Sequence, residues 1–183
     1  MRISRAMTLG LLLAALTGPV AAAEGYAIRP GDVLNISVWN EDNMTREVLV
    51  RPDGGISYPL AGELQTTGMT VSAIQDEIAK RLQKYIPDPL VTVAVQQIQG
   101  NVIYVIGKVN RPGMFVMTGD TDVMQALALA GGTATFADLK DISVLRREGG
   151  SQRAIAFNYA EIEKGRGLEQ NIVLQPGDVV VVP

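Results

Sequence analysis

The chain contains neither cysteine nor histidine among its 183 residues. Without cysteine there is no disulfide, no thiol nucleophile and no cysteine-bound metal. Without histidine the chain lacks the commonest general base and the commonest metal ligand. These absences exclude Ser-His-Asp and Cys-His hydrolases and histidine-bound zinc enzymes, so we expect no enzyme activity, no cofactor and no metal site.

Aromatic residues and positive charge are also scarce. Aromatic residues make up 5% of the chain, which has one tryptophan, and 16 basic side chains face 19 acidic ones. Nucleic-acid binding needs a basic face, and docking on anionic lipid needs basic clusters. The composition therefore predicts no nucleic-acid partner.

Residues 1–23 have the pattern of a secretory signal peptide. Arg2 and Arg5 precede the apolar run 6–16, and Ala21-Ala22-Ala23 forms a cleavage site before Glu24. The run is shorter than the roughly 20 residues that span a bilayer, although an uncleaved anchor is the alternative. Cleavage removes two arginines and no acid, leaving 14 basic and 19 acidic side chains, a net charge of −5. We expect a periplasmic protein, soluble or peripherally associated with the outer membrane, and not a lipoprotein.

One phrase occurs near both ends of the remaining chain. Pro30-Gly31-Asp32 and Pro176-Gly177-Asp178 each precede an apolar, β-branched segment. Proline sets φ at the first central position of a type II turn, and glycine supplies the positive φ of the second. Aspartate can hold such a turn by bonding the local backbone. Both phrases predict a turn that feeds a strand, with a role for Asp32 and Asp178 as ligands or acids as the alternative.

The patterning predicts two small modules after the signal peptide, residues 24–99 and 100–183. In the first we expect strands near 33–39, 48–50, 56–58 and 90–98, and a helix from Thr70 to Tyr85. Thr70 stands in N-cap position, and apolar residues follow at spacings of three and four. The predicted acids of this helix precede its bases, as the helix dipole prefers.

The second module is expected to place one helix among short strands. The strands are predicted near 102–107, 114–116, 142–146, 154–157 and 179–182. Thr121 is the expected cap of the helix, and Gly131-Gly132 is its expected end. One helix over a small mixed sheet is a β-grasp layout. The predicted fold class is α+β, with two close-coupled mixed-sheet modules.

Taken in order, these motifs resemble the bacterial polysaccharide export family, the outer-membrane polysaccharide export or Wza-like proteins. The form resembled is a short one, with one export domain and one soluble-ligand-binding β-grasp (SLBB) domain. In the first module the matching residues are Tyr26, Pro30, Gly31, Asp32, Asp53, Gly54, Ile56, Pro59, Gly62, Asp88 and Pro89. In the second they are Gly107, Pro112, Gly113, Leu127, Ala130, Gly131, Gly132, Arg146, Pro176, Gly177 and Asp178.

The resemblance implies a periplasmic component of an exopolysaccharide or capsule export machine. Its expected partners are the polysaccharide, further copies in a homo-oligomeric ring, an inner-membrane polysaccharide co-polymerase or chain-length regulator, and a separate outer-membrane β-barrel. The separate barrel is expected because well-known members carry a lipidated cysteine and a C-terminal membrane-crossing helix. This chain has no cysteine and five residues after Asp178. The expected role is a conduit or collar between the two membranes.

Two other functions stay open. One is a soluble sugar-sensing or scaffolding module of the same pathway. The other is a glycoside hydrolase, which would need two carboxylates flanking a sugar, such as Asp53 with Glu41, Asp42 or Glu63.

Three side chains are candidates for contacts with sugar or a neighbouring subunit. Trp39 and Tyr58 could stack on sugar rings, with burial or a subunit interface as the alternative. Arg146 could bind an acidic polymer, or form with Arg147 a solvated pair at a strand end.

Overall fold

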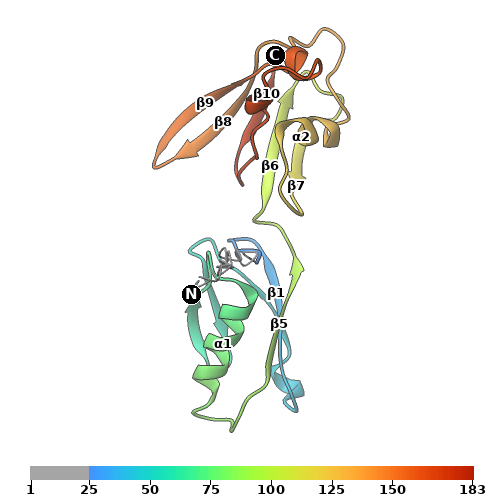
Figure 1. The fold of residues 1–183 in the computed structure, drawn as a ribbon. Coiled ribbons are helices and arrows are strands. Elements are labelled where there is room, and N and C mark those ends of the chain that lie inside the picture. Colours follow the sequence, from blue (N-terminus) through green and yellow to red (C-terminus); the bar gives the residue numbers. More distant parts are fainter. Residues whose placement is uncertain (1–24) are drawn as a thin grey trace, which may run out of the picture.

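The computed structural model describes residues 25–183, so the predicted signal peptide lies outside the described residues. The chain forms two lobes that follow one another end to end (Figure 1). Each lobe has its own hydrophobic core, built from residues between Ile28 and Val93 in the first and between Ile103 and Val182 in the second. The connection between them is the short segment from Ile98 to Asn101, between the last strand of one lobe and the first of the next.

The first lobe packs a helix on small antiparallel sheets. Strands β2 (Arg46–Leu49), β1 (Val33–Val38) and β5 (Val91–Gln97) form one sheet, and β3 (Gly55–Tyr58) pairs with β4 (Gly62–Gln65). A 3-10 turn, η1 (Asp42–Met44), follows β1. Burial alternates along β1, as its sequence predicts. Helix α1 (Val71–Leu82) contacts β5 and buries its apolar stripe in the core.

Thr70 caps α1, and its hydroxyl accepts a hydrogen bond from the Ala73 N–H at 3.2 Å. The helix ends at Leu82, three residues before the predicted end at Tyr85. The predicted start is therefore confirmed, and the predicted end is too long by one turn.

The second lobe is a five-stranded mixed sheet with one main helix. Its strand order is β7 (Gly113–Val116), β6 (Val102–Gly107), β10 (Val179–Val182), β8 (Ile142–Glu148) and β9 (Ser151–Phe157). Only β10 and β6 run parallel among these pairs. Helix α2 (Val123–Leu129) buries Val123, Ala126 and Leu127 in the core of this lobe. Two short elements, α3 (Tyr159–Ile162) and η2 (Leu168–Gln170), precede β10. The predicted α+β class is confirmed.

The cap of α2 is Asp122, so the prediction of Thr121 is wrong by one residue. Asp122 and Gln125 form a reciprocal capping box, with backbone-to-side-chain bonds of 2.8 and 2.9 Å. Thr121 is buried instead, and its hydroxyl donates to the Gly119 carbonyl at 3.2 Å. The box wins because it satisfies two N–H groups at the helix start where a lone hydroxyl satisfies one.

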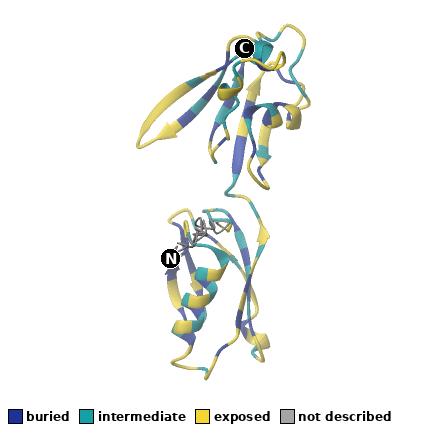
Figure 2. Ribbon diagram, in the orientation of Figure 1, coloured by how far each residue is buried: buried dark blue, intermediate teal, exposed yellow. Residues whose placement is uncertain are grey.

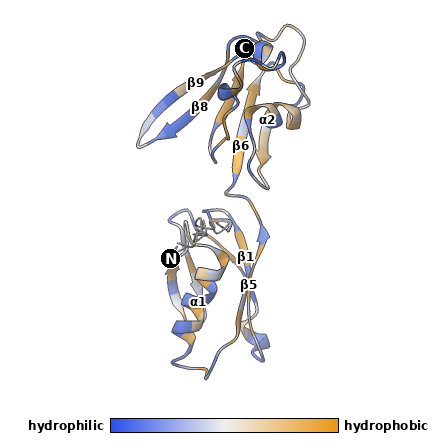
Figure 3. Cartoon of the chain, viewed as in Figure 1, coloured by the Kyte–Doolittle hydropathy of each residue, from blue (hydrophilic) through white to orange (hydrophobic). Residues whose placement is uncertain are grey.

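One face of the five-stranded sheet exposes apolar side chains. Tyr104 and Ile106 of β6 are 40% and 45% exposed, and Met114 and Val116 of β7 are 59% and 43% exposed. Tyr104 lies opposite Met114 in the strand register, so these side chains share one face. The alternate residues of β6, such as Ile103, are buried in the core. Figure 2 shows buried and exposed positions along β6, and Figure 3 shows that much of this strand is hydrophobic. Within residues 25–183, no helix combines the length and the apolar character that crossing a bilayer requires.

Candidate functional site

The two Pro-Gly-Asp turns have the same local geometry. Gly31 and Gly177 have φ values of 95° and 90°. In each turn the aspartate N–H donates to the carbonyl three residues earlier, at 3.2 Å for Asp32 and 3.0 Å for Asp178. The Oδ2 atom of each aspartate accepts from the N–H of that same residue, at 2.9 and 2.8 Å. Locally, both aspartates therefore clamp a tight turn that needs glycine.

Asp32 also holds the connection between the lobes. Its side chain is fully buried, and its Oδ1 accepts from the N–H groups of Gln99 and Gly100 at 3.0 and 2.9 Å. Its Oδ2 accepts a further bond from the Tyr26 hydroxyl at 2.8 Å. Burial, together with the bond to Asp32, raises the pKa of the Tyr26 hydroxyl, which keeps this donor protonated. One carboxylate thus joins the first turn of the lobe to the segment that leaves it.

Asp178 uses its carboxylate differently, in a buried ion pair. Arg146 Nε lies 3.0 Å from Oδ1, and Arg146 Nη2 lies 2.7 Å from Oδ2 and 3.0 Å from the Val173 carbonyl. Both side chains are at least nine-tenths buried. The interpretation of Arg146 as a polymer contact or a solvated pair is therefore wrong. Its guanidinium ties β8 to the turn before β10, whereas Arg147 is exposed.

Tyr58 is also unavailable to a sugar. Its ring is 3% exposed, and its hydroxyl donates to the Met44 carbonyl at 2.7 Å. The alternation of β3 places this side chain on the core face. The prediction that Tyr58 stacks on a sugar ring is therefore wrong, and its burial is confirmed. Trp39, in contrast, is 72% exposed.

The other motif residues lie at turns and close approaches. Positive φ values occur at Gly54, Gly62, Gly107, Gly131 and Gly132. Pro59 lies in a turn, Pro112 lies in the connection between β6 and β7, and Gly113 begins β7. At Gly107 a β-carbon would lie 2.0 Å from the Val182 carbonyl oxygen, so only glycine permits this approach of β10. These residues shape the backbone.

Asp53 and Glu63 do not form an acid–base pair for hydrolysis. Both bond to Arg51, whose Nε lies 3.2 Å from Asp53 Oδ1 and whose Nη2 lies 2.6 Å from Glu63 Oε2. Hydrogen bonding to Arg51 holds the pKa of each carboxyl below its usual range, whereas a general acid needs a raised pKa. Glu41 and Asp42 follow the far end of β1, away from Asp53, since Leu49 near Asp53 pairs with Val33 at the start of β1. The structure thus brings Asp53 and Glu63 together, but around a shared arginine that holds both carboxyls ionised, and it leaves Glu41 and Asp42 apart from them.

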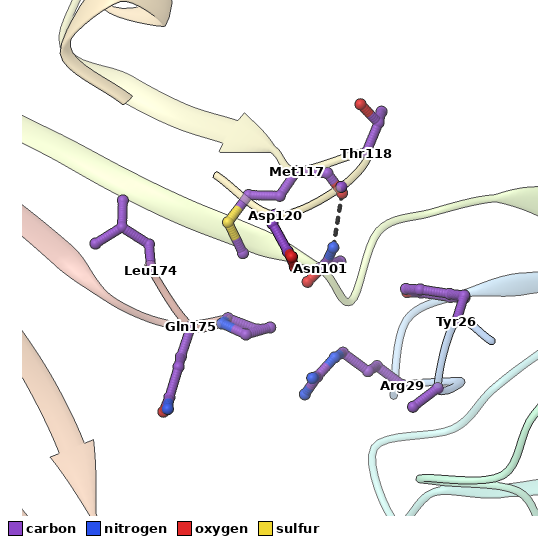
Figure 4. A pocket seen from close by; sticks show the side chains of 11 residues that line it. Tyr26, Arg29, Asn101, Met117, Thr118, Asp120, Leu174 and Gln175 are labelled. Atoms are coloured by element: carbon purple, nitrogen blue, oxygen red, sulfur yellow. Dashed lines mark hydrogen bonds between the residues drawn. The ribbon is translucent and has the colours of Figure 1, made fainter. Parts of the chain in front are cut away.

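A hollow of about 440 Å³ lies where the two lobes meet (Figure 4). Tyr26 and Arg29 line it from the first lobe, and the 117–120 and 174–176 loops line it from the second. Asn101 anchors the second-lobe side, because its Nδ2 donates to the Met117 carbonyl at 2.7 Å. Sequence reasoning missed this hollow, because its walls are loops separated by about half the chain. It has the size of a small-molecule pocket, and residues of both lobes line it.

Each lobe matches a known domain family. Residues 20–96 match the family described as polysaccharide biosynthesis/export protein, and residues 102–156 match the SLBB domain. Together these matches cover most of the chain.

Several curated proteins are similar along most of this chain. The EPS I polysaccharide export outer membrane protein EpsA of Ralstonia nicotianae is 29% identical over 90% of this chain and 49% of its own length. The capsule polysaccharide export outer membrane protein CtrA of Neisseria meningitidis is 28% identical over 87% and 46%, respectively. The capsule polysaccharide export protein BexD of Haemophilus influenzae is 27% identical over 85% and 43%. The chain spans about half the length of these relatives, and it carries a polysaccharide biosynthesis/export domain followed by an SLBB domain.

Proposed function

We propose that this protein is a periplasmic part of a machine that exports exopolysaccharide or capsule. It serves there as a conduit or collar between inner-membrane machinery and an outer-membrane channel, and it carries out no catalysis. The observation that carries this proposal is the succession of an export domain and an SLBB domain in a chain that is similar, over 85–90% of its length, to relatives named for polysaccharide export.

The joint between the lobes supports a part of fixed shape. The four hydrogen bonds to the buried Asp32 carboxylate bind the entry of the first lobe to its exit. A unit whose connecting segment is anchored in this way can repeat around a ring with the same contacts at each step. We therefore propose a homo-oligomer whose protomers stand side by side.

The apolar sheet face supplies a surface for such assembly. Tyr104, Ile106, Met114 and Val116 form a contiguous exposed patch across β6 and β7. Strand β7 is also an edge strand, and unpaired edges can join neighbouring chains. Large exposed apolar patches mark interaction sites. We propose that this face packs against the next protomer, with the two ends of the unit meeting an inner-membrane chain-length regulator and the outer-membrane channel.

Deletion of the gene tests the export role. Secreted polysaccharide, periplasmic polysaccharide and lipid-linked repeat units are measured separately in the deletion strain and after complementation with the wild-type gene. We expect secretion to fail while synthesis of lipid-linked repeat units continues. Normal secretion, with no paralogue present, would contradict the conduit role. Loss of synthesis together with secretion would point to the sensing or scaffolding module.

The mass of the purified protein tests assembly. Light scattering after size exclusion should give a multiple of the protomer mass, falling towards one protomer in Met114→Lys. Leu168→Lys is the control, because Leu168 is equally exposed, at 59%, but lies outside the β6–β7 patch. A protomer mass for the wild-type protein at all concentrations would contradict the ring.

A further inference from the structure

Trp39 is presented to solvent from a fixed turn at the end of the first lobe far from the joint. It follows β1, whereas Asp32 at the joint precedes β1. The backbone N–H of Trp39 donates to the Leu90 carbonyl at 2.9 Å. The backbone N–H of Glu41 donates to the Val38 carbonyl at 3.1 Å and closes the turn. Asn40, between them, has a φ of 62°. The backbone that carries the exposed indole is therefore held by hydrogen bonds on both sides.

A hollow of about 590 Å³ lies beside this indole. It is lined by Ser37, Val38, Trp39, Asn40, Asp42, Thr45, Leu90 and Thr92. These residues come from β1, the turn with η1, and β5. The hollow thus combines one aromatic wall with three hydroxyls, one amide and one carboxylate.

The polar groups of the hollow are available to a ligand. Within residues 25–183, none of these five polar side chains enters a hydrogen bond or ion pair with another residue. The neighbouring side-chain bonds use other groups, such as Arg46 with the Asn43 carbonyl and Tyr58 with the Met44 carbonyl. Polar groups without a protein partner bond solvent, which a polar ligand can replace.

This chemistry matches a pyranose sugar. A sugar ring has an apolar C–H face, which can lie on the electron-rich face of an indole. Its hydroxyls donate and accept at once, as do the serine and threonine hydroxyls and the asparagine amide. The carboxylate of Asp42 accepts only, and it repels an acidic sugar.

We propose that the hollow beside Trp39 binds a neutral pyranose unit of the exported polysaccharide. The identification of that sugar as cargo rests on the proposed export function. A second copy of the chain is the main competing occupant, but five of the eight lining residues are polar, unlike the apolar β6–β7 patch. The sugar site and the assembly surface therefore lie on different lobes.

Trp39 supplies its own probe, because it is the single tryptophan of the chain. The purified protein is titrated with cellopentaose, maltopentaose and tetragalacturonate, while tryptophan emission and the indole Nε1–H NMR signal are followed. We expect a saturable change in both signals with at least one neutral oligosaccharide, and weaker binding of the acidic one. The substitution Asp42→Asn removes the repelling carboxylate, so it should reduce the difference in affinity between the neutral and the acidic oligosaccharides.

Two variants separate recognition from folding. Asn40→Gly keeps a residue that accepts the positive φ and removes the amide, and Thr92→Val removes a hydroxyl at constant shape. Each should weaken binding by about three- to tenfold, the value of one hydrogen bond, without changing the melting temperature. Thr135→Val, an exposed threonine of the second lobe, is the control and should leave affinity unchanged.

No saturable change in either signal with all three oligosaccharides would overturn the sugar site. A signal that changes with protein concentration and not with sugar would overturn it too, because the indole would then lie between copies. These results are independent of the deletion experiment. If the deletion strain loses secretion but the protein binds no sugar, the export role stands and the sugar site is refuted. If the protein binds sugar but the deletion strain secretes normally, the sugar site stands and the export role is refuted.

Discussion

The two buried aspartates show how one residue type serves two roles after the same turn. Asp32 accepts bonds from neutral donors and anchors the segment that leaves the first lobe, whereas Asp178 neutralises a buried arginine within the second lobe. The local role follows from Pro-Gly-Asp and could be predicted. The long-range partners could not, because Gln99 and Arg146 lie 67 and 32 residues away, and periodicity carries no information on such pairings.

Alanine at Gly31 or Gly177 should destabilise the protein through the backbone alone. A β-carbon at Gly177 would meet nothing within 4 Å, and one at Gly31 would make ordinary contacts at 3.7 Å or more. The φ values of 95° and 90° are nevertheless strained for alanine, at about 1–3 kcal/mol. Thermal or urea unfolding measures the loss. Gly119→Ala is the control, since Gly119 has open space and no positive φ, and equal stability of all three variants would refute the strain.

Removing one partner of the Arg146–Asp178 ion pair should lower the free energy of unfolding more than replacing both partners with apolar side chains. Arg146→Met leaves a buried carboxylate unpaired, which destabilises by about 3–5 kcal/mol. Asp178→Leu leaves a buried guanidinium and should cost a similar amount. The double variant should lose markedly less stability than the two single variants added together. Unfolding in urea measures all three losses. Arg153→Met, at an exposed pair with 3.7 Å separation, should cost less than about 1 kcal/mol. Strict additivity would mean that the pair is not coupled.

Among the elements, long periodic segments could be predicted and short ones could not. The stripe of α1 and the alternation of β1 reflect burial of one face, which the sequence records directly. Strand β4 and helix α3 have four residues each, too few to show a period, although β4 pairs with its neighbour β3 and Asn158 caps α3 locally. The cap at Asp122 could be predicted from the sequence, because Gln125 three residues later completes the capping-box pattern.

The β3–β4 hairpin should show carboxyls that titrate below their usual range. Arg51 bonds Asp53 and Glu63, and Glu63 also accepts a bond from the Ser57 hydroxyl. Because the folded pKa values are lowered, the stabilisation is present above the ordinary carboxyl range and is lost as the pH falls through the lowered values. All three groups are exposed, so the effect on stability is small.

Arg51→Met should raise the pKa of Glu63 towards its ordinary value, as carboxyl-carbon NMR titration would show. Arg166→Met is the matched control, because it removes the same kind of partner from Glu161 and should leave Glu63 unchanged. An unchanged Glu63 titration in the Arg51 variant would assign the lowered pKa to Ser57 instead.

At the scale of the whole molecule, one carboxylate ties the segment that connects the two lobes to the first of them. Asp32 accepts four hydrogen bonds, two on each oxygen, from two segments of the first lobe. The substitution Asp32→Asn would place an amide N–H₂ against two of these donors, because asparagine has a single side-chain oxygen. We therefore expect this variant to release the 98–101 segment, at a cost of about 1–3 kcal/mol for the unmade bonds.

Limited proteolysis with thermolysin, which cuts before apolar residues such as Ile98, would measure this release. Each 1.4 kcal/mol of local stability changes the open population about tenfold, so cleavage between the lobes should rise by about that factor or more. Asp53→Asn, at an exposed turn of the same lobe, should cleave at the wild-type rate. A wild-type rate in Asp32→Asn as well would mean that other contacts hold the joint, and the fixed shape that a ring of identical protomers requires would then need another origin.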